Sequence, residues 1–178
     1  EVIHIGTQIS DYLVQISRRN LNQQQSEFAT QLLDVSTDLK HIGDLIKKDM
    51  GPLLQKKADG QIAFSEEGRE ELLAFHQNVL GAYDTAMEAF EENDGNLART
   101  VVRAKPELVA QHRTYRLAHY ERLSAQRQES LESSDIHLDL VDYLRRIYSY
   151  AESIALTMLE GYLDMRLASR RPDADSDT

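Results

Sequence analysis

The sequence predicts an all-α fold made of antiparallel helix bundles with five long helices. Apolar residues recur every three or four positions along almost the whole chain, and no segment shows the apolar–polar alternation of a half-buried strand. Only three prolines and eight glycines interrupt the 178 residues, so the helices can be long. A chain of this length buries roughly 70% of its unfolded surface, which is enough for one domain.

The first two helices are expected over about 1–20 and 22–58. Pro52, after Gly51, predicts a kink in the second, because proline lacks an amide donor and clashes with the preceding turn. Gly60 predicts its end. The apolar stripes are Val2, Ile5, Ile9, Leu13 and Ile16 in the first helix, and Phe28, Leu32, Val35, Leu39, Ile42, Ile46, Met50 and Leu53 in the second.

Three further helices are expected over about 66–92, 95–127 and 135–169. Ser65 is the predicted cap of the third, Pro106 should kink or split the fourth, and Ser133-Ser134-Asp135 should cap the fifth. The polar segment 170–178 is expected to be a disordered tail. The stripes are Leu72, His76, Val79, Leu80, Tyr83, Met87 and Phe90; then Leu97, Val101, Ala104, Leu108, Tyr115 and His119; then Ile136, Leu140, Leu144, Ile147, Ala151, Ile154, Met158 and Tyr162.

Composition and missing motifs exclude several functions. The chain has no cysteine, which rules out disulfides, thiolate metal sites and a cysteine nucleophile. A net charge of −10 disfavours binding to nucleic acid or anionic lipid, and no apolar run reaches the ~18 residues of a membrane span. The sequence contains no Walker A loop, GxGxxG, GxSxG or HExxH pattern. We therefore expect no catalytic residue, no cofactor and no membrane insertion by this chain.

Acidic residues and one histidine on the second helix are the candidate metal ligands. Asp34, Asp38 and His41 share one stripe and could supply two oxygens and a nitrogen, although a solvated helix flank explains them more simply. Asp44 lies one turn after Lys40, whose ammonium group would repel a metal, so an exposed Lys40–Asp44 ion pair is expected instead. We expect no bound metal.

The remaining charged and histidine residues have structural explanations. On the fifth helix, Asp142 and Arg146 are expected to form an i,i+4 ion pair within an outward stripe that also holds Asp135 and Asp139. Partly buried histidines bonded to a neighbour account for this residue type better than a ligand cluster does. His76 and His119 are predicted on or near core stripes, and His112 and His137 at seam edges.

Two segments resemble the signature segments of PhoU-like domains. These are LLDVSTDLKHIGDLI at 32–46 and SDIHLDLVDYLRRIYSYAESIA at 134–155. Together with YLVQISRRNLNQQQSEF at 12–28, they are most similar to the C-terminal cytoplasmic domain of bacterial Na⁺/phosphate cotransporter family proteins. The resemblance covers roughly residues 1–165.

The resemblance implies a domain over 1–169 built from two three-helix repeats. Residues 66–169 would form the complete second repeat, and 1–60 a first repeat that lacks its opening helix. The chain opens on Glu1 within a helical pattern, so an upstream part is expected. The uncovered apolar face of the first repeat would seek a second copy or the missing segment.

The family's metal signature, an acid-xxx-Asp pair in each repeat, is largely lost here. The first pair falls on Lys40 and Asp44, and the second on Arg145 and Ser149. Multinuclear metal binding is therefore not expected, although the fold is.

Three functions remain open. The first is a non-enzymatic regulatory or scaffolding domain of a sodium-dependent phosphate transporter. It would lie on the cytoplasmic side of the membrane, bind the transporter's membrane domain or other phosphate-system proteins, and possess the surface for a homodimer. The second is a stand-alone PhoU-type regulator of phosphate uptake. The third is a metal-binding helical bundle, which the absence of an ExxH pair at a seam position disfavours.

Overall fold

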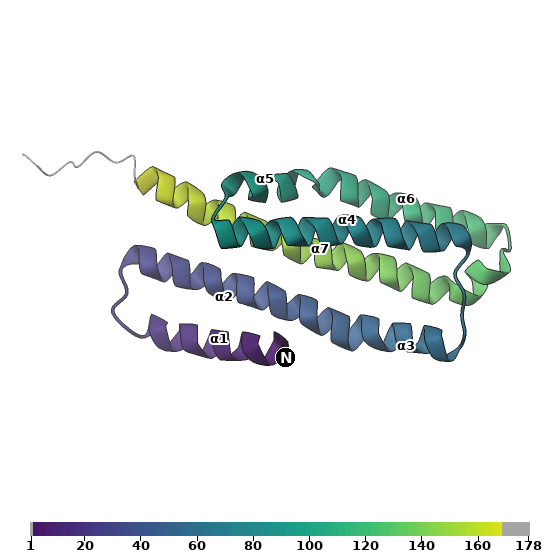
Figure 1. Cartoon of the computed structure of the whole chain (residues 1–178), viewed down its shortest axis with the longest axis horizontal. Helices are drawn as coiled ribbons and strands as arrows, with labels where there is room; N and C mark the ends of the chain where they lie inside the picture. The colour runs from purple at the N-terminus through teal and green to yellow at the C-terminus, as the bar shows by residue number, and fades with distance from the viewer. Residues whose placement is uncertain (1, 169–178) are drawn as a thin grey trace, which may run out of the picture.

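The computed structural model describes residues 2–168, and within this range the chain forms five helical rods and no strand (Figure 1). The predicted all-α fold with five long helices is therefore confirmed. The first rod is α1 (Val2–Ser17) and the second runs without a break from Gln23 to Asp59. Among residues 2–168, no helix has the length and apolar character needed to cross a membrane. The predicted tail, 170–178, lies outside the described residues.

The second rod changes its helical type in the middle. It consists of α2 (Gln23–Asp44), a π-helical segment η1 (Leu45–Met50) and α3 (Gly51–Asp59). The Gly51 amide donates to the Ile46 carbonyl, a bond that spans five residues instead of four. The rod thus stays helical through Pro52, as expected, and the widened turn lies directly before it.

The third rod has the predicted boundaries, whereas the fourth starts as predicted but ends at Ser124, about three residues early. α4 (Glu66–Glu92) begins at the Ser65 cap, whose hydroxyl accepts a hydrogen bond from the Gly68 amide, and ends at Asn93 in the left-handed region with φ 54°. The fourth rod is split, as Pro106 predicts, into α5 (Gly95–Arg103) and α6 (Lys105–Ser124).

The predicted start of the last helix was wrong. α7 (Gln128–Ala168) begins seven residues before Asp135, so the segment Ser133-Ser134-Asp135 is inside the helix and caps nothing. Ser130 and Ser133 are buried, and the Ser133 hydroxyl donates to the Glu129 carbonyl one turn earlier. A serine that satisfies its hydroxyl on its own helix can face the core, and the sequence pattern does not distinguish this case from a cap.

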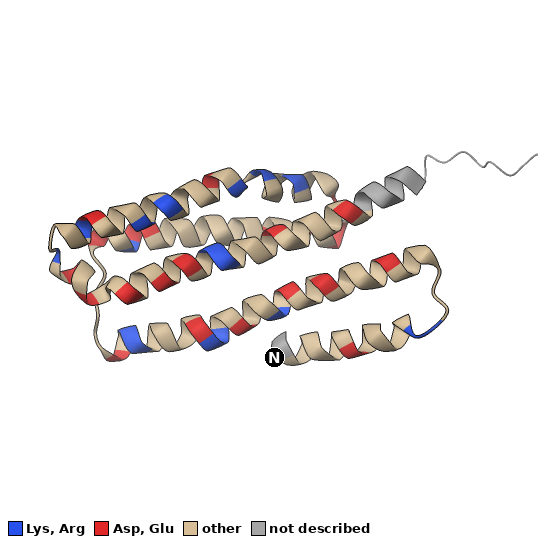
Figure 2. Ribbon diagram, turned by 180° about the vertical axis from the view of Figure 1, so that it is seen from behind, with Lys and Arg blue, Asp and Glu red and all other residues tan. Residues whose placement is uncertain are grey.

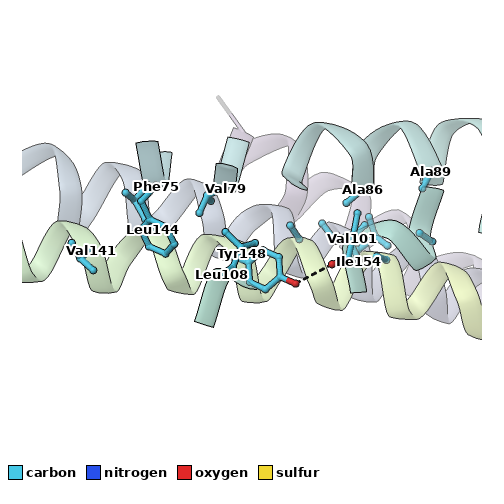
Figure 3. Close-up of a cluster of buried hydrophobic side chains, with 14 of the residues drawn as sticks. Phe75, Val79, Ala86, Ala89, Val101, Leu108, Val141, Leu144, Tyr148 and Ile154 are labelled. Atoms are coloured by element: carbon cyan, nitrogen blue, oxygen red, sulfur yellow. Dashed lines mark hydrogen bonds between the residues drawn. The ribbon is translucent and has the colours of Figure 1, made fainter. Parts of the chain in front are cut away.

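α7 is the central helix of the fold. α4, α5 and α6 pack around it on one side, while α2, η1 and α3 pack along its other side (Figure 1). α1 contacts α2 alone among the described elements. The main core lies between α4, α5, α6 and α7 (Figure 3), and its buried members include Phe75, Val79, Ala86, Val101, Leu108, Val141, Leu144, Tyr148 and Ile154.

Several residues of the predicted stripes are exposed. In α4, His76 and Leu80 face solvent, contrary to the prediction. Leu45 is buried in place of Ile46, because the π-helical turn rotates the rod at this point. With Ile46, the exposed predicted members on the first two rods are Ile5, Ile9 and Phe28. The side chains of Val2 and Tyr162 lie outside those that the structure describes.

Tyr148→Phe is expected to lower the free energy of unfolding by about 1–2 kcal/mol. The Tyr148 side chain is fully buried, and its hydroxyl donates to the Val101 carbonyl at 2.9 Å (Figure 3). Removing the hydroxyl leaves that carbonyl oxygen without this donor in the core. Urea unfolding followed by circular dichroism measures the loss, and a variant as stable as wild type would contradict it.

Candidate functional site

The candidate metal ligands on α2 do not converge. Asp34 and His41 are exposed, and the His41 ring lies 5.2 Å from the ring of Tyr150 on α7. Asp38 is half-buried, and burial raises its pKa although a hydrogen bond from Ser153 acts in the opposite direction. Within the described residues, no three His, Asp or Glu side chains are placed to hold one metal ion.

Asp44 forms a different ion pair from the predicted one. Its Oδ1 atom lies 3.0 Å from the Lys48 ammonium group, one turn later in the rod, so Lys40 was the wrong partner. Lys40 instead lies beside α1, where its Cβ is 3.6 Å from the point that a Cβ on Gly6 would occupy. The Asp44–Lys48 pair is partly exposed, so its contribution to stability is small.

The second pair of signature positions also lies on one helix surface. The Arg145 guanidinium donates to the Ser149 hydroxyl at 3.0 Å, and this hydroxyl in turn donates to the Arg145 carbonyl. These two residues interact with each other and present no carboxylate.

Asp142 joins α7 to α6. Its carboxylate accepts hydrogen bonds from Arg116 at 2.6 and 2.7 Å and lies 2.7 Å from His112 Nε2, so the predicted pair with Arg146 was wrong. Burial alone would raise the pKa of Asp142, but the bonds from Arg116 and His112 lower it below its ordinary value. The cluster ties two helices together at the surface.

A buried polar cluster is the most unusual arrangement in the structure. We call it the histidine cluster: His119, His137, Glu71 and Arg122. The two imidazole rings stack with centroids 4.5 Å apart and planes 9° apart, and each residue is only 1% exposed. His119 comes from the end of α6 and His137 from the start of α7, so the stack joins these two helices near the turn that connects them.

Each imidazole has a hydrogen-bond partner. His137 Nε2 lies 3.3 Å from the Gly68 carbonyl of α4, and since a carbonyl only accepts, this nitrogen carries the proton. His137 Nδ1 is then an acceptor, and no hydrogen-bond partner is found for it within the described structure. His119 Nε2 lies 3.0 Å from the Ser134 hydroxyl.

Gly68 makes room for the histidine cluster. A Cβ at this position would lie 3.3 Å from the His137 ring and 3.0 Å from the Ser65 hydroxyl. The segment 65–68 therefore has two roles. Ser65 caps α4, and Gly68 lets the His137 ring reach the α4 backbone.

Glu71 and Arg122 lie beside the stacked rings. Two guanidinium nitrogens donate to the two carboxylate oxygens at 2.8 and 2.7 Å, and the side chains are only 16% and 11% exposed. Glu71 Oε2 also lies 3.8 Å from His137 Nε2. This bidentate ion pair links α4 to α6. It gives the Arg122 guanidinium a counter-charge beside the two imidazoles.

The environment favours the neutral form of both histidines. Burial, then the neighbouring His119 and Arg122, lower the pKa of His137 to about 4. Burial and Arg122 also lower the pKa of His119. Both rings are closed off from solvent and pack between α4, α6 and α7.

A hollow of about 280 Å³ lies between α4 and the α5–α6 rod. Its wall combines amide and hydroxyl side chains with apolar ones such as Val101 and Leu108, and the Asn78 amide donates to Gln111 at 3.0 Å. The lining contains Glu107 but neither Lys nor Arg. This chemistry does not suit an anion such as phosphate.

Of the four residues in the histidine cluster, the sequence predicted a core position only for His119. His119 was expected in the core, whereas His137 was placed at a seam edge and Glu71 and Arg122 were not singled out. The available signal was the position of His137 in α7, one residue after Ile136 and three before Leu140 on the buried stripe.

Comparison with known proteins gives four similar relatives, two of which are described. The chain is 30% identical over 154 residues to a Salmonella typhimurium protein named "Putative inorganic phosphate export protein YjbB", and 29% identical over 154 residues to the Escherichia coli K12 protein of the same name. Each alignment covers 86% of this chain, whereas the chain spans only 28% of the length of these curated relatives. The comparison with solved structures gave no significant match.

A family model matches the second half of the fold. The matched segment, residues 72–158, contains the second signature segment and both stacked histidines, whereas the first signature segment at 32–46 lies outside it. This helical region, from the first turns of α4 into α7, matches the PhoU domain.

Proposed function

We propose that this chain is a non-enzymatic regulatory domain of a membrane protein that transports phosphate. The observation that carries the proposal is the similarity over 86% of the chain to relatives named for inorganic phosphate export. The match of residues 72–158 to the PhoU domain supports the same phosphate-related role. In this proposal the domain lies on the cytoplasmic side and acts through contacts with the membrane part or with other phosphate-system proteins.

The chemistry of the described side chains supports regulation without catalysis. Acids that lie between helices pair with bases of a neighbouring helix: Glu71 with Arg122, Glu152 with Lys105, and Asp142 with Arg116. The histidine cluster is closed to solvent, and the hollow between α4 and the α5–α6 rod has neither Lys nor Arg in its lining. What remains accessible is the outer surface of long helices, which is suited to binding another protein.

Deletion of the domain within its complete gene product tests the proposal. We expect the membrane part without this domain to reach the membrane but to lose the dependence of phosphate flux on phosphate supply. Phosphate efflux and uptake would be measured in cells that lack other transporters, with sodium replaced by choline to test sodium coupling. Unchanged flux and regulation after the deletion would overturn the proposal, as would a complete reading frame without any membrane segment.

The non-enzymatic part has its own test. Purified protein should release no phosphate from phosphomonoesters or nucleoside triphosphates above the rate of a Glu71→Gln preparation purified in parallel. Turnover that survives repeated purification and scales with the protein concentration would contradict it.

A further inference from the structure

The hollow between α4 and the α5–α6 rod is an open site of a size that suits one long side chain. Its volume is about 280 Å³, and several of its lining residues, among them Gln77, Gly81 and Glu107, are exposed. Pockets for small molecules start at roughly 300 Å³. The hollow can therefore take a single side chain or a compact group, but not a helix.

The hollow lies on the side of the fold away from α1 (Figure 1). Its lining comes from α4 and the α5–α6 rod. Among the described elements, these rods contact each other and α7 but not α1, α2 or α3. A helix that packs on the apolar face of the first repeat would therefore leave the hollow accessible.

Gly81 forms part of the wall of the hollow, and nothing in the described chain requires a glycine there. It lies inside α4, where glycine weakens a helix relative to alanine. Apart from the helix backbone and the adjacent residues, no atom lies within 4 Å of the position that a Cβ on Gly81 would occupy. No described glycine has a positive φ. The missing side chain instead leaves the hollow accessible from α4.

Glu107 supplies the only charge in the lining of the hollow. It is the only acid from Gly95 to Tyr120, and the α5–α6 rod is drawn mostly tan and blue in Figure 2. Among the described residues Glu107 forms no ion pair: Lys105 pairs with Glu152 at 3.0 Å, and Arg103 is exposed and lies outside the lining. The carboxylate is thus available to a cation from another molecule.

The other polar groups of the hollow include several hydrogen-bond acceptors. The hydroxyls of Thr85 and Thr100 donate to carbonyls of their own helices at 2.8 and 3.1 Å, so toward a ligand they can only accept. Asn78 uses its amide N–H on Gln111, and within the described structure no donor is bonded to the side-chain carbonyl of Asn78 or of Gln77. A carboxylate among such acceptors fits a group that only donates, and a guanidinium has five N–H donors and no acceptor.

We propose that the hollow receives an arginine side chain from a partner protein. The guanidinium would bind Glu107 and the neighbouring acceptors, and the aliphatic stem would lie against Val101 and Leu108 at the base. The identity of the partner rests on the proposed function: it is a cytoplasmic loop of the membrane part, because such loops carry an excess of Lys and Arg. A lysine ammonium, with three donors on one atom, matches separate acceptors less well.

Nα-acetyl-arginine amide is the probe for the hollow itself. In NMR spectra of the isotope-labelled chain, it should shift the side-chain amide signals of Asn78 and Gln111 with a dissociation constant on the order of 1–10 mM, since an exposed ion pair is weak. The uncharged isostere Nα-acetyl-citrulline amide should bind about five-fold more weakly or worse, and inorganic phosphate should shift neither signal.

Three variants locate the bound probe. Glu107→Gln should weaken binding about five-fold, whereas Glu91→Gln, which removes an exposed acid of α4 outside the lining, should leave it unchanged. Gly81→Leu fills the open wall and should abolish the shifts. Thermal unfolding shows that all three variants fold. Equal binding of the arginine and citrulline probes, or shifts that survive Gly81→Leu, would overturn the hollow as an arginine site even if the domain regulates phosphate flux.

The second arm tests the partner. The membrane part, produced without this domain and held in lipid nanodiscs, should bind the chain, and Glu107→Arg should weaken this binding about ten-fold or more because it opposes two cations. Glu91→Arg is the matched control and should bind as wild type does. A chain that binds the arginine probe but not the membrane part, or equal binding of the two Arg variants, would overturn the proposed partner while the deletion experiment decides the regulatory role separately.

Discussion

Glu71→Gln is expected to lower the free energy of unfolding by about 2–3 kcal/mol. The substitution keeps the shape of the side chain but leaves the Arg122 guanidinium, only 11% exposed, without a counter-charge beside two neutral imidazoles. An unpaired charge in such a place costs more than the intact pair contributes. Urea unfolding at neutral pH, followed by circular dichroism, measures the loss.

Two comparisons separate this effect from a general loss of a salt bridge. Glu66→Gln removes a partner of Arg69 at the surface, where both side chains are more than half exposed, and should not change stability measurably. The double variant Glu71→Leu with Arg122→Leu removes both charges and should recover much of the stability lost by Glu71→Gln. If Glu71→Gln and Glu66→Gln unfold at the same urea concentration, the Glu71–Arg122 pair does not contribute to the free energy of unfolding in the way described.

Acidification is expected to remove about 2–3 kcal/mol of stability between pH 6.5 and pH 4. The pKa of His137 is about 4 in the folded chain and 6.5 as the reference value for the unfolded chain, so unfolding takes up a proton throughout this window. The contribution is complete above pH 6.5, falls as the pH drops and is lost near pH 4. His119, whose pKa is also lowered, acts in the same direction.

Substitution of His137 should flatten this pH dependence. His137→Gln lowers stability at neutral pH but removes the titrating group, so its free energy of unfolding should vary less than that of wild type across the window. His76→Gln is the control, because His76 is exposed on α4, and it should keep the wild-type slope. Asp38, whose pKa is raised, opposes the trend in the lower part of the window. An unchanged slope for His137→Gln would contradict the assignment.

The sequence predicts the boundaries of the helices better than it predicts which of their faces are buried. α4 begins at Glu66 and ends at Glu92 as expected, because Ser65 and Asn93 are strong local signals and their geometry depends on nearby backbone alone. The start of α7 was missed because Ser133 bonds to its own helix, and whether such a residue faces core or water is decided by α4 and α6. Local signals such as a capping serine determine where a helix starts or ends only when packing against residues far along the chain does not override them.

The candidate site shows the same limit. That Lys40, Arg145 and Ser149 carry no carboxylate follows from residue type alone; the structure adds that Arg145 and Ser149 bond to each other and that Lys40 lies beside α1. The bidentate pair of Glu71 with Arg122 could not be inferred, since the two residues are 51 positions apart and each alone resembles an ordinary surface charge. Similarly, Asp142 bonds to a neighbouring helix in preference to Arg146 on its own.

The π-helical segment η1 has a consequence for insertions and deletions. Leu45 is buried and Met50, five positions later, packs against the core, whereas Ile46 is 49% exposed. Loss of one residue within η1 would let the rod close into ordinary α-helix while α3 keeps its orientation, because the widened turn holds one residue more than an α-helical turn. Loss of one residue from α2 would instead turn everything after it by about 100°, and Leu53, which packs on the core, would then leave it. The rod should therefore tolerate a one-residue deletion between Asp44 and Gly51 far better than the same deletion in α2.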